Sequence, residues 1–158
     1  MIRYILGTGA GIVVAMVVLV VIDAVNHALY PPPEAVRVAA EKFDFPAIQK
    51  AFVEWLPHAP RMALILIPVA WVAGSFWGAL TATAIARGRS GIPAAIVGGL
   101  IFAGTIMNLR SVPHPTWIAL AGLLGVPAAA WAAWWLWPKS PAAIGPQPYD
   151  MREKNMAC

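Results

Sequence analysis

The sequence is short of cysteine and of charge. Cysteine occurs once, as Cys158, so a single chain can form neither an internal disulfide nor a thiolate metal cluster. Charged residues make up 11% of the 158 residues, whereas soluble domains carry about 25% because water must wet their surface. With 60% apolar residues and a mean hydropathy of +0.71, most of the surface is expected to face lipid.

The apolar residues gather in four runs, which are Ile5–Val25, Met62–Ala86, Ile92–Leu109 and Thr116–Trp137. A helix of about 20 residues crosses the hydrocarbon core of a bilayer, and each run is close to that length or longer. The sequence therefore predicts an all-α fold, an integral membrane four-helix bundle formed as one domain by residues 1–137.

No ionisable side chain lies in the middle of any of the four runs. Proton relays and ion pathways need such groups inside the membrane. Small multidrug transporters, with a glutamate in the middle of a span, are therefore excluded. Disulfide-forming oxidoreductases are excluded because they need cysteine pairs, which this sequence lacks. The lipoprotein signal peptidase is excluded because it needs two aspartates at the membrane surface, and Asp23 has no evident partner.

The positive charge predicts orientation rather than nucleic-acid binding. The net charge is +4, but Arg and Lys stand singly at the ends of apolar runs, with no basic patch interleaved with aromatics. Such placement sets the direction of membrane insertion. The side that holds both chain ends carries the basic excess, so both termini are predicted to be cytoplasmic.

Residues 26–61 form the only long segment outside the predicted spans. Its apolar residues recur at helical spacing over 45–56, with Asp44 as a plausible N-cap and Gln49 among the polar residues of the opposite face. We expect one extracytoplasmic amphipathic helix here, which either lies on the membrane surface or caps the bundle. Residues 138–158 are expected to be a poorly ordered cytoplasmic tail.

Small residues recur at every fourth position of the second run and also appear in the first. In a membrane such faces let two helix backbones approach closely. The residues that we expect at this packing face are Gly7, Gly11, Ala70, Gly74, Gly78 and Ala82.

Polar residues gather on the predicted outer side. They include Asp23 and the three histidines His27, His58 and His114, with Asn26 and Asn108 close to them in sequence. Imidazole and carboxylate groups are ligands for zinc and similar divalent ions. Asp23 and the three histidines are the candidate metal ligands, although their spacing lacks the i, i+4 histidine pair typical of a helical metal site.

Two segments carry a resemblance to known proteins. Residues 26–33 (NHALYPPP) and 108–117 (NLRSVPHPTW) look like those of small four-helix bacterial inner-membrane proteins to which no activity is assigned. The resemblance implies a multi-pass protein of the bacterial inner membrane, with both segments on its outer face. It implies no reaction and no cofactor.

Three functional hypotheses remain open. The first is a non-enzymatic accessory or scaffold subunit that packs with a larger membrane complex or with itself, favoured by small-residue faces, tryptophans near the span ends and the lack of buried charge. The second is a small-solute or divalent-metal binding or transport protein that uses the outer polar residues. The third is a membrane enzyme, for which Asp23 and His27 are the only pair to nominate.

Overall fold

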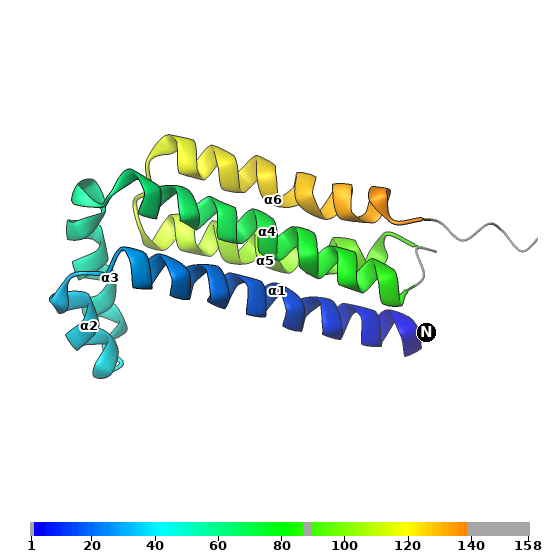
Figure 1. Ribbon diagram of the computed structural model, residues 1–158, viewed down its shortest axis with the longest axis horizontal. Helices are drawn as coiled ribbons and strands as arrows, with labels where there is room; N and C mark the ends of the chain where they lie inside the picture. The colour runs from blue at the N-terminus through cyan, green and yellow to red at the C-terminus, as the bar shows by residue number, and fades with distance from the viewer. Residues whose placement is uncertain (1, 87–89, 139–158) are drawn as a thin grey trace, which may run out of the picture.

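The computed structural model describes residues 2–86 and 90–138 (Figure 1). Every regular element in these ranges is a helix: α1 (Ile2–Leu29), α2 (Glu34–Glu41), α3 (Phe45–Trp55), the 3₁₀ turn η1 (Leu56–His58), α4 (Arg61–Ile85), α5 (Ile92–Ser111) and α6 (Thr116–Leu136). Helices α1, α4, α5 and α6 are long and apolar enough to cross a membrane. The predicted all-α chain with four long apolar helices is thus confirmed, and it indicates a multi-pass membrane protein.

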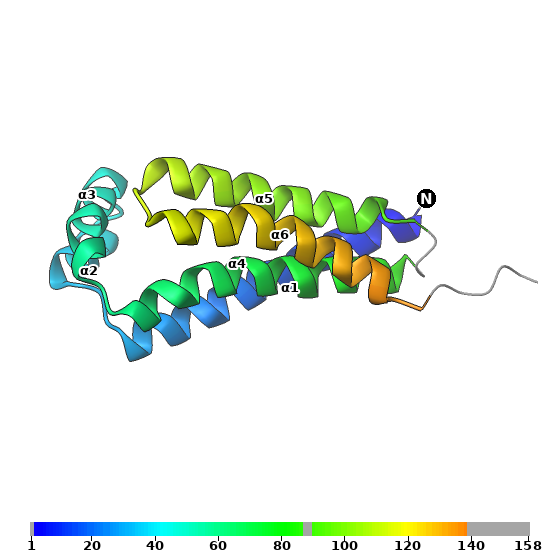
Figure 2. The same ribbon diagram turned by 90° about the horizontal axis from the view of Figure 1, so that it is seen from above.

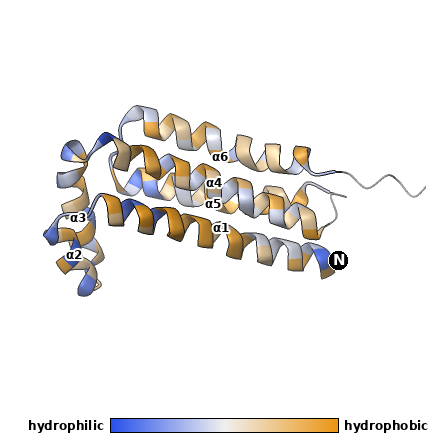
Figure 3. Cartoon of the chain, in the orientation of Figure 1, coloured by the Kyte–Doolittle hydropathy of each residue, from blue (hydrophilic) through white to orange (hydrophobic). Residues whose placement is uncertain are grey.

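The four long helices form a bundle, and α2 and α3 lie across one of its ends (Figure 1). We call this the capped end. The first turn of α1 and the last turn of α6 lie at the opposite end, as an even number of spans requires. Orange, apolar stretches run along the four long helices, while blue gathers in α2, α3 and the nearby turns (Figure 3). Of the predicted tail, residues 139–158 are outside the described part of the chain.

Helix α1 is longer than its apolar run predicted. It has 28 residues and continues to Leu29, where the run of prolines that starts at Pro31 prevents further helix. At 1.5 Å per residue it is about 42 Å long, against about 30 Å for the hydrocarbon core of a bilayer. Its last two turns, which carry Asp23 and His27, therefore belong to the capped end rather than to the apolar stretch.

Helix α2 was not predicted from the sequence. It follows Pro33 at the N-cap and has Glu34 in its first turn, where a negative charge is favourable beside the helix dipole. Its apolar face is only Val36 and Ala39, which are both buried. Phe43, with a φ of 53°, then turns the chain so that α3 packs beside α2.

Helices α1 and α4 are in close contact through glycine. A Cβ atom at Gly11 would lie 2.6 Å from the carbonyl oxygen of Gly78, and one at Gly78 would lie 2.7 Å from that of Gly11. Gly7 lies in the same way against Ala82. Gly74 lies against Leu19 and Ala15 of α1. In lipid, where the hydrophobic drive between helices is absent, such contact is the main source of helix association.

Two buried clusters of small residues lie away from the capped end. One cluster joins α4, α5 and α6 through Ala79, Ala94, Ala130 and Ala133, and another joins α1, α4 and α5 through Ala15, Ala82 and Val97. Between these small residues the helices pack closely. Towards the capped end the pair α1 and α4 separates from the pair α5 and α6 (Figure 2).

Candidate functional site

A cavity of about 630 Å³ opens at the capped end, where the helix pairs separate. Small-molecule sites in proteins have volumes of about 300–1,000 Å³. Three long helices and the α3 region each contribute one stripe of side chains, and the turn after α5 adds His114. The lining residues are Leu19, Val20, Asp23 and Asn26 of α1, Phe45, Ile48, Gln49, Phe52 and Leu56 of α3 and η1, Leu66, Ile67, Ala70 and Trp71 of α4, and Asn108, Ser111, Val112 and His114.

Helix α3 forms the roof of the cavity. Asp44 caps its first turn by accepting a hydrogen bond from the backbone N–H of Ala47 (3.1 Å). Its cavity-facing residues recur at intervals of three and four, from Phe45 through Ile48 to Phe52, as one helix face requires. The predicted helix at 45–56 is therefore present, and its apolar side covers the end of the bundle.

Gln49 was assigned to the wrong side of α3. The sequence placed it on the polar face, but its side chain borders the cavity and its Nε2 donates a hydrogen bond to the carbonyl oxygen of Ser111. The main backbone neighbours of α3 are α2 and η1 rather than the long helices. The Gln49 bond is thus a direct tie between the roof and the end of α5.

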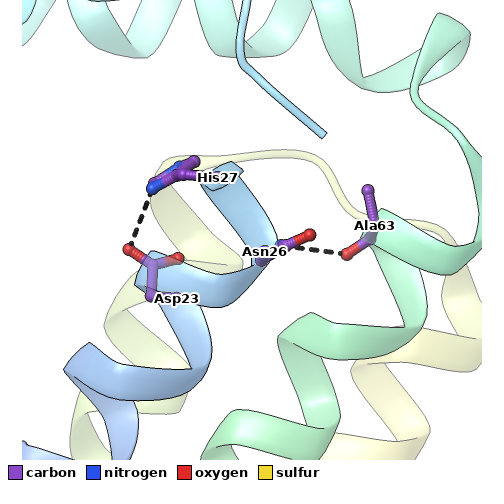
Figure 4. Close-up of polar contacts among 4 residues, drawn as sticks. All are labelled: Asp23, Asn26, His27 and Ala63. Carbon is purple, nitrogen blue, oxygen red and sulfur yellow. Dashed lines mark hydrogen bonds and ion pairs between the residues drawn. The ribbon is translucent and has the colours of Figure 1, made fainter. Parts of the chain in front are cut away.

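Asn26 joins the α1 wall to α4. Its Nδ2 donates to the carbonyl oxygen of Ala63 over 3.2 Å, as Figure 4 shows. The other amide atom, Oδ1, is buried and has no hydrogen-bond partner within the described chain. Exchanging the two amide atoms would set two acceptors against each other, so the bond to Ala63 fixes this orientation. The unpaired acceptor is a polar group for which the fold supplies no donor.

Asp23 and His27 form an i, i+4 pair on the outer turns of α1 (Figure 4). Asp23 Oδ2 lies 3.5 Å from His27 Nδ1. The Asp23 side chain is 63% exposed and borders the cavity, whereas His27 is not among the lining residues. Asp23 and Asn26, three residues apart, share the cavity-facing side of the helix.

His114 is held against the opposite wall. Its Nδ1 lies 2.7 Å from the carbonyl oxygen of Val112, and its ring meets Trp71 edge to face at 5.9 Å. Since a carbonyl oxygen can only accept, Nδ1 carries the proton, and in the neutral ring Nε2 is an acceptor.

The four candidate metal ligands do not come together. His58 is exposed at the end of η1 and does not line the cavity. Between residues 2–86 and 90–138, no group of three His, Cys, Asp or Glu side chains is placed to hold a metal ion. Asp23 and His114 border one cavity from opposite walls, and this arrangement suits an organic solute better than a metal ion.

Sequence reasoning missed most of the cavity wall. Asn26 and Asn108 were noted as outer polar residues, but Trp71 and Ser111 were not linked to them. The stripe Leu66, Ile67, Ala70 and Trp71 looks in sequence like any apolar helix face. Only the separation of the helix pairs makes it a wall.

Comparisons with protein-family models, with curated proteins and with solved structures give no match for this chain. The resemblance of residues 26–33 and 108–117 to small bacterial inner-membrane proteins therefore stays a prediction. Fold and site together define a helical protein with four candidate membrane spans and a capped cavity at one end, and its function is argued from that cavity.

Proposed function

We propose that this protein is a membrane-bound binding protein for a small amphiphilic solute. The observation that carries the proposal is the cavity beneath α3, which combines an apolar wall with polar groups at its rim. Ligand sites are usually of this kind, mostly apolar with a few placed polar groups that orient the ligand. The helices carry no mid-span charge, which agrees with binding better than with ion conduction.

The proposal includes a membrane and an orientation. All four long helices span the inner membrane of a bacterium, both termini are cytoplasmic, and α2 and α3 lie on the outer side. The order of the predicted spans in the sequence assigns a net charge of +4 to the side of the two termini and zero to the other side, which supports this direction. The cavity then opens at the outer headgroup level, where an amphiphilic molecule can arrive from either lipid or water.

Filling the cavity is expected to abolish binding. In Ile48→Trp the indole replaces an aliphatic side chain that faces the cavity from the roof, where α3 has few close backbone neighbours to disturb. The affinity for a fluorescent alkyl probe should fall at least about tenfold, equivalent to about 1.4 kcal/mol. It is measured with the protein in nanodiscs, and protein-free nanodiscs give the reference for partition of the probe into lipid.

The matched control is Val53→Trp, the same kind of substitution on the same helix at a position outside the cavity lining. It should bind the probe as the wild type does. Equal binding by wild type and Ile48→Trp, with both proteins folded by circular dichroism, would show that the cavity is not the binding site.

A second candidate function, an accessory or scaffold subunit, has support from a groove between α4 and α6. Its volume is about 730 Å³. Small residues of α6 line it at helical spacing, namely Ala121, Gly125, Ala128 and Ala132, opposite the apolar residues Ile65, Val69, Val72 and Phe76 of α4. A groove with small, apolar walls suits an apolar helix of a partner protein.

Native mass measurement tests this second candidate. Protein extracted with its surrounding lipid should migrate as a complex larger than one 16.8 kDa chain, and Ala128→Phe should release the partner by filling the groove. Leu124→Phe, at a position that is 69% exposed and outside the groove, is the control. A homodimer would identify a second copy as the occupant, and a single chain would refute the candidate.

A further inference from the structure

The polar rim of the cavity holds both donors and acceptors, because Asn108, Ser111 and Trp71 carry N–H or O–H groups while the carboxylate of Asp23 only accepts. Asn26 presents a buried Oδ1 without a donor. A molecule that pairs with Asp23 must therefore bring hydrogen-bond donors.

The charge of the rim points the same way. Asp23 is the only Asp, Glu, Lys or Arg among the lining residues, so the cavity carries a negative charge with no lysine or arginine in its wall. The only ion pair of Asp23 within the described chain is the long contact of 3.5 Å to His27. Most of its capacity to accept hydrogen bonds is therefore free for a ligand.

The remaining wall is apolar and deep. Leu19 and Val20 lie one turn of α1 before Asp23, and Leu66 and Ile67 of α4 and Phe52 of α3 also line the cavity. A ligand whose polar head meets Asp23 and Asn26 thus places its other end among hydrocarbon side chains. Burial of methylene groups there is favourable relative to water, so the tail is expected to be an alkyl chain.

We propose that the cavity binds amphiphiles with a primary ammonium head and a hydrocarbon tail. The ammonium group supplies three N–H donors and one positive charge, which match the carboxylate of Asp23. The inference rests on the proposed binding function and names its ligand class. The amine can belong to a bilayer lipid or to a free amphiphile.

The test compares three probes that share a twelve-carbon chain and differ only in the head: dodecylamine, dodecanol and dodecanoate. Each is radiolabelled and bound to the full chain in nanodiscs of phosphatidylcholine, whose head has no N–H donor. Binding to Ile48→Trp nanodiscs is subtracted as partition into the lipid. The wild type should bind dodecylamine about tenfold more tightly than dodecanol, and dodecanoate most weakly, because a charge-assisted hydrogen bond outweighs a neutral one.

Variants at Asp23 separate charge from structure. Asp23→Asn should lose the preference for the amine, a drop of about tenfold in its affinity, while dodecanol binding stays unchanged. Asp23→Glu should retain the preference. Glu54→Gln, which removes one negative charge from α3 outside the cavity lining, controls for net charge and should behave as the wild type.

The outcomes distinguish the inference from the function beneath it. Equal binding of the three probes, or an amine preference that survives Asp23→Asn, would overturn the ammonium assignment while the cavity remains a binding site. No binding above the Ile48→Trp background would overturn both. If adding phosphatidylethanolamine displaces dodecylamine, the natural ligand is an amine-headed lipid, and if it does not, the ligand is a free amphiphilic amine.

Discussion

Gly11→Ala is expected to lower the free energy of unfolding by about 1–3 kcal/mol, the usual cost of overpacking. The new Cβ would lie 2.6 Å from the carbonyl oxygen of Gly78 and 2.9 Å from the Cβ of Ala82. A backbone oxygen cannot rotate away, so α1 and α4 must separate. The higher helix propensity of alanine, about 1 kcal/mol, offsets only part of this cost.

Gly9→Ala provides the matched control on the same helix. A Cβ at Gly9 meets nothing within 4 Å, so only the propensity gain remains, and stability should be unchanged or higher by up to about 1 kcal/mol. Unfolding by SDS in mixed micelles, followed by circular dichroism, measures both variants. If Gly11→Ala were as stable as Gly9→Ala, the close contact between α1 and α4 would be refuted.

The second large effect is expected for Trp71→Ala, with a loss of about 3 kcal/mol, since truncation of a packed Trp costs about 3–5 kcal/mol in protein cores. The Trp71 ring lies directly against Gly122, where a Cβ would come within 2.8 Å of it. It also contacts His114 edge to face. Its removal unites the space under the ring with the cavity.

Trp77→Ala separates packing from the mere loss of an indole. Trp77 lies on the same helix but is 51% exposed on the outside of the bundle, so its truncation should cost less than about 1 kcal/mol. Thermal unfolding in detergent compares the two variants. Similar losses for both would mean that Trp71 has no special place in the cavity wall.

The four long helices could be predicted because their signal is one of length and composition, which needs no knowledge of tertiary contacts. Their ends were less accurate. The prediction ended α1 at Val25, where the apolar residues stop, but the helix runs to Leu29, because helix ends follow from capping and proline rather than from hydropathy. Helix α2 escaped notice because two buried residues make too short a periodic pattern.

The site was predictable only in part. Asp23, Asn26, Asn108 and His114 were all placed at one end of the bundle from the order of the spans, and all four border the cavity. Which of them meet depends on how the helix pairs diverge, and no local pattern encodes that angle. His58 shows the limit, because its neighbours in sequence put it in the outer segment, but it is exposed and is not among the cavity-lining residues.

The unequal packing of the bundle has a mechanical consequence. Its glycine and alanine contacts fasten α1 to α4 from Gly7 to Gly74, whereas near the capped end the side-chain bond of Asn26 to Ala63 is the hydrogen bond between these helices. The two helices are therefore expected to be held more rigidly along the glycine and alanine contacts than at the capped end. A change in lateral pressure within the lipid would move the helices at the capped end, where the cavity lies, and leave the closely packed opposite end in place.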